Sequence, residues 1–63
     1  MTEYENMIHA LLNNDKTNFM EIKLDDYWQI RLYMGDTILV LTYSAKTKHL
    51  IEMDYTTDNE EDN

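Results

Sequence analysis

The 63-residue sequence contains no cysteine, no proline and a single glycine. Without cysteine the chain cannot form a disulfide-stapled scaffold or a thiolate zinc site. With so little glycine it is neither collagen-like nor a flexible Gly/Ser chain. The longest apolar run, Ile38–Leu41, has four residues, which is far too short to span a membrane.

Basic residues are also scarce. Five Lys and Arg stand against thirteen Asp and Glu, so the formal net charge is −8. Direct binding of DNA or RNA is not expected, because nucleic-acid affinity depends on neutralising phosphates. The first residues show neither a basic segment nor an apolar stretch, which predicts a cytoplasmic protein without membrane contact. A chain of this size builds only a small core, and self-association is a common remedy.

Residues 2–13 have the pattern of an amphipathic helix. Thr2 and Glu5 form a capping box, in which each side chain satisfies the other residue's backbone N–H. Apolar side chains at helical spacing then form one stripe: Tyr4, Met7, Ile8, Leu11 and Leu12.

From residue 18 onward the apolar residues alternate with polar ones, which predicts four strands at about 18–24, 27–34, 37–44 and 48–56. The predicted fold class is α+β, with one N-terminal helix packed on a four-stranded antiparallel β-meander. Residues 1–57 form this single domain. Residues 58–63 contain no apolar side chain and carry four acidic ones, which predicts a disordered acidic tail.

Two loops set the predicted register. Gly35 and Asp36 fit a two-residue type II′ hairpin, and the resulting pairs are Trp28–Tyr43, Ile30–Leu41 and Leu32–Leu39. A three-residue loop at 45–47 gives the pairs Leu41–Ile51 and Leu39–Met53. The face toward the helix then holds Trp28, Ile30, Leu32, Met34, Leu39, Leu41, Tyr43, Ile51, Met53 and Tyr55. If the connection after the first strand has an odd number of residues, Met20, Ile22 and Leu24 also point to this face. A two-residue Asp25–Asp26 loop instead turns these three side chains to the opposite face.

Side chains suited to catalysis or metal binding are few. Ser44 and His49 lie near each other across one predicted strand pair, but no third orienting group or Gly-rich elbow accompanies them. A turn hydroxyl beside a histidine is the favoured interpretation. No His-x-x-x-His or calcium-loop spacing occurs. We therefore expect no enzymatic activity, no metal site and no cofactor.

The face away from the helix should be polar, yet it carries an apolar and aromatic patch. Its members are Phe19, Tyr27, Tyr33, Ile38, Val40 and Leu50, with Arg31 among them. Patches of this kind mark interfaces, so these seven residues form the predicted homodimer interface. Scattered surface hydrophobes with high β-propensity are the alternative.

Acidic residues surround this patch at strand and loop positions: Glu21, Asp25, Asp26, Asp36, Glu52 and Asp54. Glu52 and Asp54 alternate on one strand at roughly 6.6–6.8 Å, about two phosphate steps along one DNA strand. This spacing fits an imitation of the nucleic-acid backbone. The alternative is a solvated surface that keeps a small protein soluble.

In size, acidity, lack of cysteine and helix-plus-sheet order, the chain resembles small early gene products of bacteriophages. Several of these are DNA mimics that occupy the DNA-binding surface of a host protein, and they include inhibitors of uracil-DNA glycosylase, inhibitors of the nucleoid protein HU and some anti-CRISPR proteins. The resemblance implies a phage-encoded, non-enzymatic inhibitor whose acidic residues bind a host DNA-binding protein, such as an HU-type nucleoid protein. An adaptor or assembly module that binds a partner protein through the apolar sheet face is the alternative.

Overall fold

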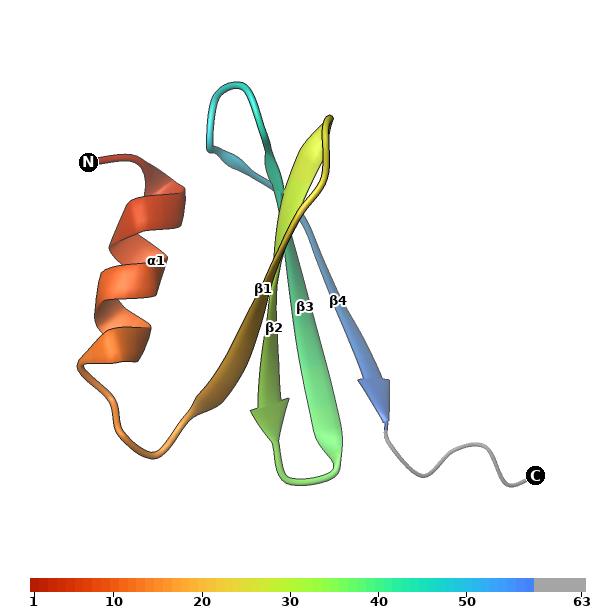
Figure 1. Cartoon of the computed structure of the whole chain (residues 1–63). Coiled ribbons are helices and arrows are strands. Elements are labelled where there is room, and N and C mark those ends of the chain that lie inside the picture. Colours follow the sequence, from red (N-terminus) through yellow and green to blue (C-terminus); the bar gives the residue numbers. More distant parts are fainter. Residues whose placement is uncertain (58–63) are drawn as a thin grey trace.

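The computed structural model describes residues 1–57 and contains one helix and four strands (Figure 1). In chain order these are α1 (Glu3–Leu12), β1 (Asn18–Lys23), β2 (Tyr27–Met34), β3 (Thr37–Ser44) and β4 (Leu50–Thr57). The strands form one antiparallel sheet in the order β1-β2-β3-β4. The predicted α+β fold, with its N-terminal helix and four-stranded meander, is confirmed. The predicted tail, residues 58–63, lies outside the described residues.

Helix α1 begins at a capping box, as the sequence predicts. Thr2 Oγ1 accepts a hydrogen bond from Glu5 N (3.1 Å), and Glu5 Oε1 accepts one from Thr2 N (3.0 Å). These bonds pair N–H groups that a helix start otherwise leaves unsatisfied. Tyr4 and Leu11 are buried against the sheet, whereas Leu12, expected in the same stripe, is 66% exposed. The buried stripe therefore ends at Leu11.

The core lies between α1 and the two middle strands. β2 and β3 pair as predicted, with Trp28 opposite Tyr43, Ile30 opposite Leu41 and Leu32 opposite Leu39. Gly35 opens the connecting turn with a φ of +63°, the left-handed value that a type II′ hairpin requires there. Ile30 is fully buried, and the buried side chains packed in the same cluster are Tyr4, Leu11, Leu32, Leu41 and Tyr43.

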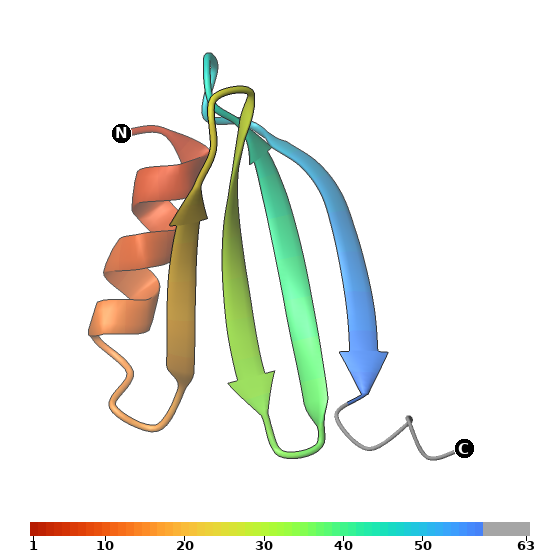
Figure 2. The same ribbon diagram turned by 45° about the vertical axis from the view of Figure 1, so that its right-hand side comes forward.

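The helix covers only one face of the sheet. Figures 1 and 2 show α1 beside β1, while β4 lies at the far end of the sheet. We call the face that carries α1 the helix face. The opposite face, which no helix or strand of residues 1–57 covers, is the outer face. Side chains alternate between these faces along each strand, so the register decides which residues each face presents.

The connection between β1 and β2 is the two-residue loop Asp25–Asp26. Leu24 N–H donates to Tyr27 O across this loop at 3.0 Å. The sequence leaves open whether this connection has an odd or an even number of residues. With two residues, Met20 and Ile22 point to the outer face.

Phe19 and Glu21 therefore lie on the helix face, and the prediction that they point outward is wrong. Phe19 pairs with Leu32 and packs against the core. Glu21 lies opposite Ile30, where an unpartnered carboxylate would be unfavourable. The Tyr4 hydroxyl donates to Glu21 Oε1 at 2.7 Å, and this hydrogen bond accommodates the acidic side chain beside the core.

Strand β4 is shifted from its predicted position. It begins at Leu50, and Leu41 lies opposite Met53 instead of Ile51. Likewise Leu39 lies opposite Tyr55 instead of Met53. A register irregularity near the start of β4 leaves Ile51 as an extra residue, as in a β-bulge, so the predicted pairing was wrong here.

The shift also moves Leu50. This residue lies opposite Tyr43 on the helix face, and the prediction that it points outward beside Val40 is wrong. The cause is the β3–β4 loop, which is longer than the three residues predicted. Lys48 closes this loop with a φ of +67°, and its N–H donates to Ser44 O at 2.8 Å. A left-handed lysine is uncommon, and no sequence signal marks it.

Candidate binding surfaces

The outer face presents six apolar or aromatic side chains from three neighbouring strands. These are Met20 and Ile22 of β1, Tyr27 and Tyr33 of β2, and Ile38 and Val40 of β3. Tyr33 lies directly opposite Ile38, as predicted. Five of the seven members of the predicted interface thus stay on this face, Arg31 among them, and the two residues gained from β1 replace Phe19 and Leu50. The result is an apolar and aromatic patch, interrupted by Arg31, Gln29 and Thr42, that no helix or strand of residues 1–57 covers.

Arg31 lies in the middle of this surface. It stands between Met20 of β1 and Val40 of β3 in one row across the sheet, and it is exposed. Polar contacts brace the rows on either side. Gln29 Nε2 donates to Thr42 Oγ1 at 3.2 Å, and the Tyr33 hydroxyl lies 4.0 Å from Met20 Sδ. The outer face therefore combines apolar area with one central cation.

Two acidic residues border the outer face along β4. Glu52 lies opposite Thr42 and Asp54 opposite Val40, and both are exposed. Within residues 1–57 the ion pairs join Lys23 to Glu21 and His49 to Glu3, so neither border acid has a basic partner there. These two carboxylates are available to a cation on another molecule.

The remaining predicted acidic residues lie elsewhere. Asp25 and Asp26 form the β1–β2 loop, and Asp36 lies in the β2–β3 turn at the opposite end of the sheet (Figure 1). Glu21 is held on the helix face by Tyr4 and lies 3.9 Å from Lys23 Nζ. The structure thus brings only Glu52 and Asp54 together with the apolar patch.

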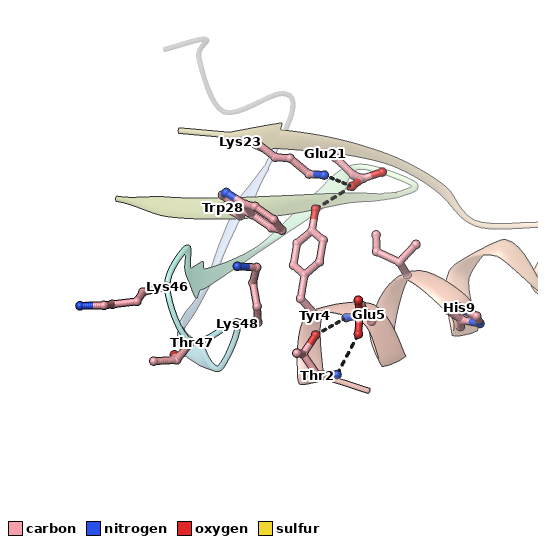
Figure 3. A pocket seen from close by; sticks show the side chains of 11 residues that line it. Thr2, Tyr4, Glu5, His9, Glu21, Lys23, Trp28, Lys46, Thr47 and Lys48 are labelled. Atoms are coloured by element: carbon pink, nitrogen blue, oxygen red, sulfur yellow. Dashed lines mark hydrogen bonds and ion pairs between the residues drawn. The ribbon is translucent and has the colours of Figure 1, made fainter. Parts of the chain in front are cut away.

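A pocket of about 570 Å³ opens between the start of α1, strands β1 and β2, and the β3–β4 loop (Figure 3). Lys23 Nζ lies 4.5 Å and Lys48 Nζ 4.3 Å from the centre of the Trp28 ring, so two cations stack on one indole. Lys48 Nζ also donates to Ala45 O. Lys46 lines the rim and points away from Trp28 (Figure 3). The two stacked lysines fasten β1 and the β3–β4 loop to Trp28.

Tyr4 links this pocket to the core. Its ring meets Trp28 at 4.9 Å and Tyr43 at 5.1 Å, both edge to face. Burial, and after it the hydrogen bond to Glu21, raises the pKa of Tyr4 well above its ordinary value. Burial likewise raises the pKa of Tyr43. Both phenols are therefore protonated near neutral pH, and Tyr4 acts as a neutral donor to Glu21.

Hydrogen bonding to the Thr2 backbone lowers the pKa of Glu5, so the capping carboxylate is ionised at neutral pH.

Ser44, which the sequence analysis considered beside His49 for catalysis, accepts hydrogen bonds from Lys46 N (3.2 Å) and Thr47 N (3.1 Å). Its hydroxyl thus stabilises the β3–β4 loop, in agreement with the turn interpretation. His49 Nδ1 lies 3.6 Å from Glu3 Oε1.

Sequence reasoning did not find the Trp28 pocket. It assigned no role to Lys23, Lys46 or Lys48. The pocket depends on the orientation of β1, which turns Lys23 to the helix face, and on the left-handed backbone of Lys48. Together these features bring Lys23 and Lys48 over the Trp28 ring. Only the cluster of Lys46 and Lys48 near an aromatic-rich strand pair hinted at it.

Comparison with models of protein families, with curated proteins and with solved structures finds no match to this chain. Its residues therefore carry the functional argument. Among residues 1–57, no three His, Cys, Asp or Glu side chains gather in a way that could hold a metal ion. The described part of the chain also has no helix that combines the length and apolarity of a membrane span.

Proposed function

We propose that this protein is a non-enzymatic binding module that acts through the outer face of its sheet. One observation carries this proposal: six apolar or aromatic side chains share a face that no helix or strand of residues 1–57 covers. In a sheet with a helix on one side, the other side is normally polar. An uncovered patch with this many apolar and aromatic side chains on so small a protein is typical of an interface.

The first occupant of this face is a second copy of the chain. A two-fold contact places the same surface against itself, so cations on one copy must meet anions on the other. The outer face has this arrangement, with Arg31 at its centre and Glu52 and Asp54 at one border. A two-fold axis parallel to the strands and over β3 stacks β2 of each copy on β4 of the other, which brings Arg31 of each copy toward the β4 acids of its partner copy.

Substitutions on the outer face test this dimer. Val40→Glu puts an unpaired charge into the apolar contact and should raise the dimer dissociation constant at least about a hundredfold. Met20→Glu, at a more exposed position, should weaken the dimer in the same direction. Asn6→Glu adds the same charge on α1 and should leave dimerisation unchanged. Sedimentation velocity reads the association, and thermal melts verify folding. Equal dissociation constants for all four proteins would refute the outer-face dimer.

A second candidate function is inhibition of a DNA-binding protein by an acidic surface. The supporting observation is that Glu52 and Asp54 lie on the same face of β4 without a basic partner in residues 1–57. A dimer doubles this array, and the loop acids Asp25, Asp26 and Asp36 extend it at both ends of the sheet. A partner of this kind presents a basic groove that normally receives phosphates.

Competition with DNA tests this second function. An HU-type nucleoid protein is loaded with fluorescent duplex DNA, and the protein is titrated in at fixed salt. The acidic-inhibitor function predicts displacement of the DNA, and the double variant Glu52→Lys, Asp54→Lys should abolish it. The matched control Thr42→Lys, Thr56→Lys adds positive charge to the same face and leaves both acids in place. Displacement by the Glu52/Asp54 variant as strong as by the wild type would contradict this function.

A further inference from the structure

Strand β4 is exposed along its whole length. Among residues 1–57 it forms one edge of the sheet and pairs only with β3, and all eight of its residues are exposed. An edge strand offers a row of backbone N–H and C=O groups that can pair with another strand. Proteins usually protect such an edge by making it short, by placing charges, proline or a β-bulge on it, or by covering it. β4 is long, has its irregularity only near its start, and carries charges on one side only.

The helix-face side of β4 is apolar. Met53 and Tyr55 are 56% and 68% exposed although they stand opposite the core residues Leu41 and Leu39. The reason is the position of α1, which lies beside β1 at the other end of the sheet (Figure 2). A shallow groove of about 340 Å³ separates α1 from the start of β4, and its lining includes Met7, Ala10, Tyr43 and Leu50. Apolar surface thus continues from this groove along β4.

The outer-face side of the same strand is acidic. Glu52 and Asp54 alternate with the apolar residues and have no basic partner within residues 1–57. Asp54 Oδ1 also accepts the Tyr55 backbone N–H at 3.0 Å. The sequence that follows β4, residues 58–63, contributes four more acidic side chains.

These charges oppose the pairing of β4 with another copy of β4. An antiparallel two-fold pairing places Glu52 and Asp54 of both copies beside one another on the same face. Like charges across neighbouring strands are destabilising. The edge therefore disfavours self-association and favours a strand of opposite charge.

We propose that β4 binds an extended segment of a partner protein in which basic and apolar residues alternate. The segment adds a fifth strand to the sheet, with its backbone paired to β4. Its apolar side chains contact Met53 and Tyr55 on the helix face, and its lysines or arginines meet Glu52 and Asp54 on the outer face. This site goes beyond the outer-face dimer, because its apolar half lies on the opposite side of the sheet.

Short synthetic peptides test the proposal. The probe is an eight-residue peptide of alternating valine and lysine, titrated into the isotope-labelled full-length protein and followed by the backbone amide signals. One control has the same composition with four valines followed by four lysines. The other control is the alternating peptide N-methylated at every second residue, which removes donors along one edge. We expect the alternating peptide to bind at least about tenfold more tightly than either control, with the largest signal changes in β4.

Variants assign the site. Met53→Thr with Tyr55→Thr should weaken the alternating peptide about tenfold, and both positions are exposed enough for the fold to persist. Glu52→Thr with Asp54→Thr should weaken it and reduce its dependence on salt. Met20→Thr on the outer face is the matched control and should not change binding. Equal binding of the N-methylated peptide, or signal changes confined to the outer face, would overturn the proposal. A peptide-induced change in molar mass beyond one peptide per chain would point to a second copy at this edge instead.

Discussion

At the residue scale, Tyr4 joins the three parts of the folded chain. Its ring touches Trp28 of β2 and Tyr43 of β3, and its hydroxyl donates to Glu21 of β1. The sequence placed Tyr4 on the buried stripe of the helix, because the apolar spacing there is regular. It did not reveal the hydrogen bond to Glu21, because that contact requires Glu21 to lie on the helix face.

The raised pKa of Tyr4 predicts a pH dependence of stability. The folded protein holds the phenol proton to higher pH than the unfolded chain, whose tyrosines titrate near pH ~10. The contribution of Tyr4 is therefore complete below about pH 10 and decreases as the pH rises further. The free energy of unfolding should fall more steeply above about pH 10 in the wild type than in Tyr4→Phe. Tyr43, whose pKa is also raised, leaves some slope in the variant.

Urea unfolding followed by circular dichroism, repeated at several pH values from about 8 to 11, measures this difference. Parallel pH profiles for the wild type and Tyr4→Phe would show that the phenol does not titrate differently in the two states. The comparison within one pH value cancels the effects of pH that are common to both proteins.

At the scale of elements, the turns decide how much of the structure the sequence predicts. The β2–β3 register follows from the Gly35–Asp36 turn, because a two-residue loop with glycine first leaves few alternatives. For the β1–β2 loop the sequence allowed an odd or an even length. The two-residue loop Asp25–Asp26 places Met20 and Ile22 on the outer face and Phe19 and Glu21 on the helix face. The β3–β4 loop departs further, since Lys48 lies in the left-handed region and Ile51 is an extra residue. The predicted outer-face set shares these errors: its β2 and β3 members lie on that face, whereas Phe19 and Leu50 lie on the helix face.

The β3–β4 loop gives a prediction of its own. An L side chain in the left-handed region costs about 1–2 kcal/mol, and glycine does not bear this cost. Lys48 offsets part of the cost by stacking on Trp28. Lys48→Ala keeps the strain and loses the stacking, whereas Lys48→Gly loses both. We expect Lys48→Gly to be about 1 kcal/mol more stable than Lys48→Ala in urea unfolding, and the reverse order would contradict the observed loop geometry.

At the scale of the whole molecule, one helix is too little to cover a four-stranded sheet. α1 lies beside β1 and buries the middle strands, which leaves the outer face and the helix-face side of β4 exposed. The sequence predicted an uncovered apolar sheet face, because apolar residues occupy both alternating positions of β3. It did not predict the second apolar surface, since the residues of β4 were expected to lie under the helix.

Both surfaces are candidate binding sites, and the outer-face dimer is the central proposal. A chain of 7.6 kDa would gain stability by burying apolar surface against a second copy, and the positions of Arg31, Glu52 and Asp54 suit a two-fold contact. In such a dimer the backbone edge of β4 stays open, but Glu52 and Asp54 face Arg31 of the other copy, so peptide binding through these acids would compete with the ion pairs of the dimer.

The molar mass of the wild-type protein tests the outer-face interface most directly. Size-exclusion chromatography with light scattering is run over a range of loading concentrations up to the high micromolar. The outer-face interface predicts a mass of twice 7.6 kDa, about 15 kDa, at the upper end of the range. A mass of 7.6 kDa at every concentration would contradict it.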